Sequence, residues 1–331
     1  MWSPVLLPCG QVSQIWGLLK VKTLVLGGYG AVGARVCATL RAAGHDAIAA
    51  GRDPVRADRV VDLRDERAYR RALSDVAVVV NASGTEDPSL VEIAARRGVA
   101  FVDITATMDY IRAVEALDPP APVLLSVGLA PGLTNLLAAA VHVRAPGPID
   151  IALLLGSGER HGAAGTDWAY HLLGRQFTDT ATSRPIRNYT QSRVFQLPGG
   201  GSRRLYRADY SDQHVLTRDL KAPVRTYFGL DSRIATLALA LMTWVPTASQ
   251  AARRLHVPGT DHWIALAVGS DGTTRWAEGD GQSQATATMT ASAVQLVAVL
   301  SPGVHHLHEV MALADIRPEG GIRIGLDAHD A

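Results

Sequence analysis

Three glycines near the start of the chain have the spacing of a phosphate-binding turn. Gly28, Gly30 and Gly33 fit the pattern G-x-G-x-x-G within the run Gly28-Tyr29-Gly30-Ala31-Val32-Gly33. The first glycine permits a tight turn, the second lets the backbone approach a pyrophosphate, and the third lets a helix pack close to a strand. A helix that begins here offers unpaired N–H groups and the positive end of its dipole to the phosphates. The spacing therefore predicts that residues 28–33 bind a dinucleotide.

The apolar pattern around these glycines supplies the strand and the helix that such a site requires. Lys22–Leu26 has a strand pattern, and a helical pattern runs from Ala31 to Ala43, with Gly44 as its stop signal. Further strands are expected at 46–50, 59–62, 76–80, 100–104 and 123–127, and helices at 66–73, 88–97 and 108–116. This alternation predicts an α/β fold with a doubly wound parallel sheet of the Rossmann type. Without that context the glycines would indicate only an ordinary turn.

The end of the second strand is expected to choose between the two nicotinamide cofactors. NAD enzymes usually carry an acid there for the ribose hydroxyls, whereas NADP enzymes carry a small residue and a nearby Arg for the 2′-phosphate. This chain has Gly51 followed by Arg52, with Arg56 close by. NADP is therefore the predicted cofactor; if Asp53 reaches the ribose instead, the cofactor is NAD. Asp62, at the end of the third strand, is a further predicted cofactor contact.

Residues that follow the later strands are expected beside the nicotinamide. In a Rossmann enzyme the reacting centre lies at the carboxyl ends of the strands. After the fourth strand these residues are Asn81, Ala82 and Ser83, and after the sixth they are Gly128, a cofactor contact, and Pro131, a substrate contact. Asn81 has an alternative interpretation as a cap of its strand.

The middle of the chain has an α+β pattern. Strands are expected at 149–155, 194–197 and 224–230, helices at 166–173, 232–244 and 286–300, and a hairpin at 262–268 and 273–278. The Asp-Gly pair between the two β runs is a strong turn signal for that hairpin.

One glycine-rich loop of the middle segment carries acid–base side chains. It contains Glu159, Arg160 and His161, and Trp168 follows shortly after. His can donate a proton near neutral pH, and Arg can hold a carboxylate with two parallel hydrogen bonds. We therefore predict His161 as the catalytic acid, with Glu159 as the group that tunes it. Arg160 and Trp168 are predicted substrate contacts. The alternative is a solvated turn that caps the next helix.

Other histidines are candidates for catalysis or for metal binding. His214 ends the cluster Tyr210-Ser211-Asp212-Gln213-His214 and is the second candidate for the catalytic acid. His305, His306 and His308 lie close together but have no cysteine or carboxylate framework around them. We expect these three to form a polar helix face, and we predict no metal site.

Charge and cysteine content narrow the class of protein. The 32 basic and 31 acidic residues give a net charge of +1, which predicts no binding to nucleic acid or to an anionic membrane surface. Cys9 and Cys37 are too few for a disulfide framework or a zinc site, and this composition fits the cytoplasm. Residues 1–19 lack a basic start and are interrupted by prolines, so they are expected to be an added extension, neither a signal peptide nor a membrane span.

Together these motifs resemble those of the saccharopine dehydrogenase-like (saccharopine reductase-type) family of NAD(P)-dependent oxidoreductases. The matching residues are the run 28–33, Asn81, Val102-Asp103-Ile104, Gly128-x-x-Pro131-Gly132-Leu133 and Gly303-Val304. The resemblance implies an N-terminal Rossmann domain, a substrate domain on a mixed sheet, and a C-terminal segment that returns to the Rossmann domain. Applied to this chain, the layout is an extension at 1–19, a Rossmann domain at 20–132, a substrate and dimerisation domain at 133–289, and a returning segment at 290–331.

The resemblance favours an NADPH-dependent reductase that acts on a C=N or C=O group. The middle domain shows no dense cluster of Arg and Lys, so we expect a less charged small molecule than saccharopine, of the kind found in specialised metabolism. An enoyl or keto reductase is the close enzymatic variant. The alternative from another class is a non-catalytic NADP-binding protein that senses redox state or regulates a partner. Because an open mixed sheet leaves a face or an edge to cover, a homodimer built on the hairpin is also expected.

Overall fold

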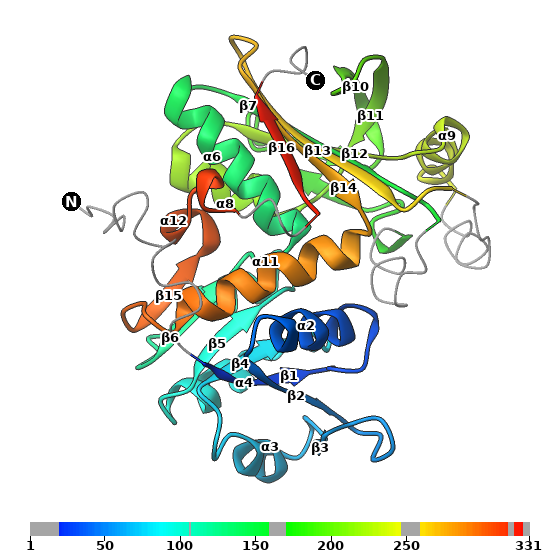
Figure 1. The fold of residues 1–331 in the computed structure, drawn as a ribbon. Helices are drawn as coiled ribbons and strands as arrows, with labels where there is room; N and C mark the ends of the chain where they lie inside the picture. Colours follow the sequence, from blue (N-terminus) through cyan, green and yellow to red (C-terminus); the bar gives the residue numbers. More distant parts are fainter. Residues whose placement is uncertain (1–19, 106, 159–169, 246–258, 317–320, 327–331) are drawn as a thin grey trace. The chain divides into compact units, whose positions relative to one another are not determined.

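The computed structural model describes residues 20–105, 107–158, 170–245, 259–316 and 321–326. The chain forms two compact units (Figure 1). The first combines the described residues up to Leu133 with Thr286–Ile316. The second combines the described part of Thr134–Ala285 with a short strand near the C-terminus.

The first unit is built on a sheet of seven parallel strands. They are β1 (Lys22–Leu26), β2 (Asp46–Gly51), β3 (Arg59–Val60), β4 (Val78–Asn81), β5 (Ala100–Asp103), β6 (Pro122–Leu125) and β15 (Gly303–His306). Their order across the sheet is β15-β6-β5-β4-β1-β2-β3, which is the order of a doubly wound dinucleotide-binding sheet with one strand added at the edge. The predicted Rossmann-type sheet is therefore confirmed. The central strands β4 and β5 are buried along their whole length, which explains their continuous apolar runs.

Helices cover both faces of this sheet. α2 (Ala31–Ala42) and α11 (Gln282–Val297) lie side by side on one face (Figure 1), where the side chain of Gln295 is 3.0 Å from Nε2 of His45. α3 (Glu66–Ala72), α4 (Pro88–Ala95) and α5 (Met108–Glu115) belong to crossovers that run in the opposite direction across the sheet. Right-handed crossovers place these three on the other face. Asp65 and Asp87 cap the N-termini of α3 and α4 by accepting backbone N–H bonds.

The second unit contains a mixed sheet of seven strands. They are β7 (Ile149–Leu155), β10 (Thr190–Gln196), β11 (Ser202–Arg207), β12 (Val224–Leu230), β13 (His262–Gly269), β14 (Thr274–Asp280) and β16 (Arg323–Leu326). Their order is β10-β11-β12-β7-β13-β14-β16, in which only β7 and β12 run parallel. β8 (Gln176–Thr178) and β9 (Pro185–Arg187) form a separate pair. The mixed sheet that the family resemblance implies is present.

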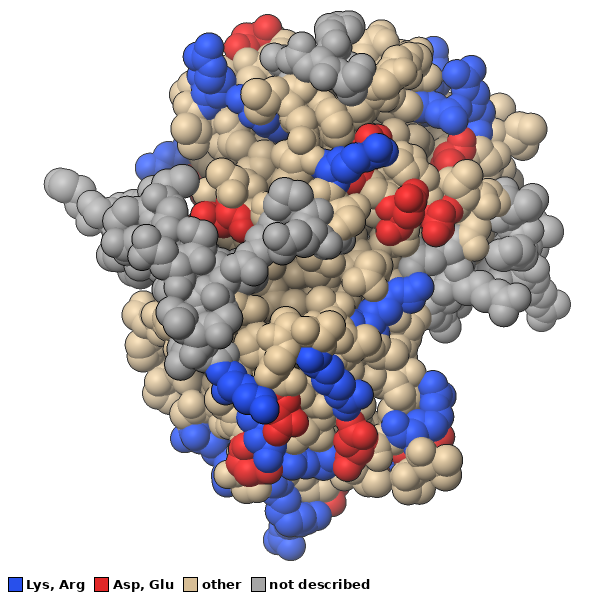
Figure 2. Space-filling model, in the orientation of Figure 1, with Lys and Arg blue, Asp and Glu red and all other residues tan. Residues whose placement is uncertain are grey.

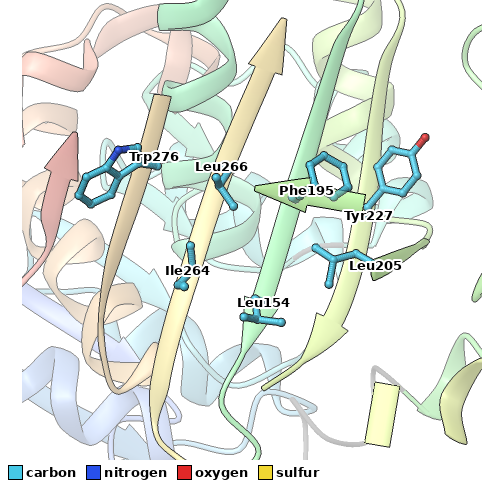
Figure 3. Packing of buried hydrophobic residues seen from close by; sticks show 8 residues of the cluster. Leu154, Phe195, Leu205, Tyr227, Ile264, Leu266 and Trp276 are labelled. Atoms are coloured by element: carbon cyan, nitrogen blue, oxygen red, sulfur yellow. The ribbon is translucent and has the colours of Figure 1, made fainter. Parts of the chain in front are cut away.

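The core of the second unit lies on both faces of its sheet. Helix α6 (Thr134–Arg144) packs on β7, β13 and β14, α8 (Ser211–Leu220) packs on β12, and α9 (Arg233–Met242) packs on β11 and β12. Gly269 of β13 faces Val141 of α6, so the alternation of side chains turns Ile264 and Leu266 to the opposite face. There they belong to a buried cluster with Leu154, Phe195, Leu205, Tyr227 and Trp276 (Figure 3).

β11 and α8 were not expected from the sequence, and neither were the short strands β8, β9 and β16. β11 is rich in Arg, yet its side chains alternate, and Leu205 and Arg207 are buried. Arg207 occupies this inward position because its guanidinium forms an ion pair with Asp179 at 2.8 Å. Helix α8 contains the polar cluster around His214. The strand expected at 194–197 is the end of the longer β10.

The C-terminal segment is divided between the two sheets. β15 pairs with β6 in the first sheet, and β16 pairs with β14 in the second. His305 and His306 lie on β15, and His308 lies on the short helix α12 (Leu307–Val310). The expectation that these three histidines share one helix face is therefore wrong, because the edge strand extends through the first two.

The predicted hairpin is present as β13 and β14, but it offers no sheet edge. β13 also pairs with β7, and β14 also pairs with β16. The outer strands of this sheet are instead β10 and β16. Among the described residues, pairing between two protomers through this sheet would use β10 or β16.

The surface carries a mixture of charges. On the face shown in Figure 2, Lys and Arg side chains alternate with Asp and Glu. The described residues also include exposed apolar side chains along α9, among them Ile234 (82% exposed) and Leu241 (62% exposed). None of the described helices combines the length and the apolar character that crossing a membrane requires.

Candidate cofactor site

Glycines shape the turn between β1 and α2. Gly27 has a φ of +71°, in the left-handed region that favours glycine. A Cβ atom on Gly33 would collide with the carbonyl oxygen of Gly27, and one on Gly28 would lie 2.5 Å from Cα of Ala49. Larger residues at these positions would push α2 away from the sheet. The glycines therefore bring the first turn of α2 close to the end of β1.

The N-terminus of α2 fits an anionic group. Its N-cap residue is Gly30, and no side chain caps it. The N–H of Gly30 donates to the carbonyl oxygen of Gly27 at 2.8 Å, which closes the turn. The N–H groups of the first helical turn, Ala31, Val32 and Gly33, then have no partner within the helix. Together with the helix dipole they form a donor set suited to a pyrophosphate, as the glycine spacing predicts.

Tyr29 organises the end of β2. Its hydroxyl oxygen accepts the backbone N–H groups of Arg52 at 3.0 Å and Asp53 at 3.1 Å. A Cβ atom on Gly51 would collide with the Tyr29 ring. The packing of Tyr29 therefore favours glycine at position 51, whichever cofactor binds. This packing is a reason for Gly51 that the sequence pattern did not reveal.

The charged side chains that follow β2 and β3 differ in the contacts that they make. Arg52 and Arg56 are exposed, and the Arg56 guanidinium lies 4.5 Å from the centre of the Tyr29 ring. Oδ1 of Asp53 accepts the N–H of Val55 at 2.9 Å, which ties that carboxylate to its own turn. Asp62 follows β3, and its carboxylate accepts hydrogen bonds from the Arg64 side chain, which lower the pKa of Asp62 to about 2.

A buried polar network joins the carboxyl ends of β4 and β5. Asn81 and Asp103 are register partners, and Nδ2 of Asn81 donates to Oδ2 of Asp103 at 3.1 Å. Oδ1 of Asn81 accepts the Ser83 hydroxyl at 2.7 Å, which holds the chain after β4. Asn81 therefore acts as a strand-end cap. The backbone of Ala82 and Ser83 remains the predicted cofactor contact at this place.

Asp103 is the centre of this network. The carboxylate also accepts the Tyr110 hydroxyl at 2.6 Å, the backbone N–H of Thr105 at 2.7 Å, and the Thr105 hydroxyl. Asp103 is 1% exposed. Burial raises the pKa of Asp103, although these hydrogen bonds act in the opposite direction. The motif Val102-Asp103-Ile104 includes this position, but no sequence spacing predicts its contact with Tyr110.

The loop after β6 contains the predicted contacts Gly128 and Pro131. The carbonyl oxygen of Gly128 accepts the N–H of Leu133 at 2.8 Å, and the N–H of Leu129 donates to Oγ1 of Thr286 at 3.3 Å. The Ala130–Pro131 peptide bond is cis, and Pro131 is buried. The loop is therefore held at both ends within the first unit.

A second arrangement at the same edge of the sheet was not predicted. Oγ of Ser126 lies 2.9 Å from Nδ1 of His306, and Nε2 of His306 lies 2.7 Å from Oε1 of Glu115. Ser126 and His306 are separated by 180 positions in the sequence, and they meet because β15 pairs with β6. No local pattern could have revealed this contact.

The predicted catalytic residues lie in the second unit or outside the described part of the chain. Glu159, Arg160, His161 and Trp168 lie outside the described residues. His214 lies on α8, with Nε2 2.7 Å from Oδ1 of Asp209 and its ring edge-on to Phe177. Its side chain is 18% exposed. Among the described residues, no group of three or more His, Cys, Asp or Glu side chains is arranged to hold a metal ion.

The raised pKa of Asp103 predicts a pH-dependent stability. A group whose pKa is raised on folding stabilises the protein at low pH, and this contribution is lost as the pH rises through the raised pKa. In urea unfolding, the free energy of unfolding of the wild type relative to Asp103→Asn should fall as the pH rises above the ordinary Asp value of 3.8. Asp109→Asn is the control, since the Asp109 side chain is 94% exposed. Parallel pH curves for the wild type and Asp103→Asn would contradict the assignment.

Comparisons with known proteins agree with this architecture. Residues 23–127 match the model of the NAD dependent epimerase/dehydratase family. The structure is similar to saccharopine dehydrogenase (L-Glu forming) from Saccharomyces cerevisiae, with a TM-score of 0.65 and 15% identity over 93% of this chain and 99% of that one. No curated protein matches the sequence.

Two further solved structures are more distant. The amine dehydrogenase from Mycobacterium smegmatis has a TM-score of 0.46 and 11% identity over 90% of this chain and 98% of that one. Aspartate semialdehyde dehydrogenase II from Vibrio cholerae has a TM-score of 0.45 and 10% identity over 85% of this chain and 99% of that one. The fold assignment rests on the first comparison, and it agrees with the resemblance read from the sequence motifs. The chain therefore has the fold of the saccharopine dehydrogenase-like oxidoreductases, and its N-terminal unit is a nicotinamide dinucleotide-binding Rossmann domain.

Proposed function

We propose that the protein is an NADPH-dependent reductase of a C=N or C=O group in a small molecule. The observation that carries the proposal is the uncapped N-terminus of α2 beside the glycine turn, with two exposed Arg side chains at the neighbouring end of β2. The first feature suits a pyrophosphate, and the second suits the 2′-phosphate that distinguishes NADP from NAD. A cytoplasmic location is part of the proposal and is supported by the low cysteine content.

The preference for NADP rests on charge. The Tyr29 ring packs where a Cβ on Gly51 would lie, so the small size of Gly51 is weak evidence for a phosphate. The Asp53 carboxylate is tied to the N–H of Val55, which makes it a poor partner for ribose hydroxyls. Arg52 and Arg56 are the cations at this end of the sheet with which a 2′-phosphate would pair. Nη2 of Arg56 already donates to the Tyr29 carbonyl oxygen at 2.8 Å, so Arg52 is the first candidate.

We expect Arg52→Ala to weaken NADPH binding selectively. Loss of a hydrogen bond to a charged group costs about 1.5–3 kcal/mol, whereas NADH has no 2′-phosphate to lose. The backbone N–H of Arg52 keeps its bond to Tyr29 in this variant, so the turn should remain intact. Dissociation constants for NADPH and NADH can be measured by fluorescence titration. Equal losses for both cofactors would contradict NADP specificity.

The proposed reaction needs positioned groups in addition to the cofactor. NADPH, when bound, supplies a hydride. The strand-end backbone at Ala82–Ser83 and Gly128–Leu129 would hold the nicotinamide, and Pro131 would contact the substrate. A proton must then reach the heteroatom of the reduced bond. The candidate donors are His161 with Glu159 beside it, and His214; Arg160 and Trp168 would orient the substrate.

Replacing the proton donor should slow the chemical step and leave cofactor binding intact. We expect His161→Asn to reduce the rate of single-turnover NADPH oxidation about 10²–10⁴-fold, because that is the usual contribution of a general acid. The assay uses a panel of imines and ketones, with His214→Asn measured in parallel. A large loss for His214→Asn alone would move the acid to α8.

Small losses for both variants would favour the other candidate functions. The pairing of His214 with Asp209 and its packing on Phe177 fit a structural role for that histidine. If both histidines prove dispensable, a reductase that takes its proton from water, or a non-catalytic NADP-binding sensor, becomes the better proposal. Turnover of an enoyl or keto substrate would select that variant of the reductase.

We also propose a homodimer. The support is that β10 and β16 are the outer strands of the second sheet among the described residues, and an outer strand offers backbone groups with which another chain can pair. Light scattering at micromolar concentration should therefore give about twice the mass of one chain. A monomeric mass under these conditions would refute the dimer.

A further inference from the structure

Three side chains from distant parts of the first unit meet beside the loop Gly128–Leu133, which we call the cofactor loop. Ser126 directly follows β6, His306 ends β15, and Glu115 ends α5. His306 contacts Ser126 through Nδ1 at 2.9 Å and Glu115 through Nε2 at 2.7 Å. A carboxylate accepts hydrogen bonds, so Nε2 carries the proton toward Glu115, and Nδ1 faces the Ser126 hydroxyl.

Burial decides what this arrangement can do. A serine hydroxyl that is hydrogen-bonded to a histidine, which is itself bonded to a carboxylate, is the arrangement that activates a nucleophile in many enzymes. However, Ser126 is 1% exposed and His306 is 3% exposed. A substrate carbonyl could not reach the hydroxyl oxygen without displacing core residues. The arrangement therefore suits holding the chain in place better than attack on a substrate.

The backbone of Ser126 shows why it needs to be held. Its φ is +57°, a left-handed conformation that glycine adopts easily and serine does not. A serine is nevertheless present, and its hydroxyl group is bonded to His306. The hydrogen bond offsets the unfavourable conformation, and it fixes the direction in which the chain leaves β6.

That direction determines the path of the cofactor loop. A Cβ atom on Gly132 would lie 3.0 Å from the carbonyl oxygen of Ser126, so the far end of the loop packs directly on the Ser126 turn. The bond from the N–H of Leu133 to the oxygen of Gly128 closes the loop between these points. A shift of Ser126 would therefore move the backbone of Gly128.

We propose that His306 is a positioning residue that holds Ser126, and through it the Gly128–Leu133 loop, in place for the nicotinamide half of the cofactor. The proposal rests on the proposed NADPH function. Glu115 fixes the His306 ring from its other side. Other ionisable groups near His306 include Glu309, which accepts the His306 backbone N–H at 2.7 Å, and His308, whose ring centre is 5.8 Å away.

Two probes separate this effect from general damage. NADPH reaches both the glycine turn and the loop, whereas adenosine 2′,5′-bisphosphate has the adenine end and the 2′-phosphate but no nicotinamide. In calorimetric titrations of the full chain, we expect His306→Phe and Glu115→Leu to weaken NADPH about tenfold and to change the affinity for the bisphosphate less than about twofold. Glu115→Gln should restore NADPH binding, because the amide oxygen still accepts the Nε2 proton.

Control variants keep the test decisive. His305→Phe changes the neighbouring histidine, whose Nε2 lies 3.0 Å from the Ser301 carbonyl oxygen, and this variant should bind both probes normally. Ser126→Gly removes the hydroxyl but suits the left-handed backbone, so it should fold and still lose NADPH affinity. Equal losses for both probes, or no loss in any variant, would overturn the positioning role. If the wild type binds neither probe, the proposed NADPH function itself fails.

Discussion

The close approach of α2 to the end of β1 is the constraint on which the cofactor site depends. This approach is possible because Gly33 has no Cβ atom, which would collide with the Gly27 carbonyl oxygen. The same approach aims the first N–H groups of α2 at the carboxyl edge of the sheet. Leu26 pairs in register with Asn81, and Asn81 with Asp103, so the glycine turn and the polar network are fixed relative to each other by the strand ladder.

Hydrogen bonds stabilise the buried polar network at the carboxyl ends of β4 and β5. Burying a carboxyl group is unfavourable, and burial raises the pKa of Asp103 accordingly. Hydrogen bonds from Asn81, Thr105 and Tyr110 offset part of that penalty. Oδ2 accepts from both Asn81 and Tyr110, so removing either donor leaves this buried oxygen with one hydrogen bond fewer. A network of this kind specifies one geometry, which a site that must place backbone groups around a nicotinamide requires.

Local sequence patterns located most strands of the first unit and only part of the second. The alternating strands and helices up to residue 127 and the glycine turn are contiguous signals, so six of the seven strands of the first sheet could be placed. β11 could not, because Arg207 is a charged residue at a core position, and its burial depends on Asp179 from outside that strand. The contact between Ser126 and His306 depends on β15 joining the sheet after the whole second unit. Such pairings leave no periodic signal in the sequence.

Gly51 illustrates how one residue can carry two explanations. Read from the sequence, its small size leaves room for a 2′-phosphate; read from the structure, its small size leaves room for the Tyr29 ring. The second explanation holds for either cofactor, since Tyr29 binds the backbone of Arg52 and Asp53 in both cases. A glycine at this position is therefore weak evidence for NADP. The proposed NADP specificity therefore depends on cations that can pair with a phosphate dianion, and Arg52 and Arg56 are the candidates.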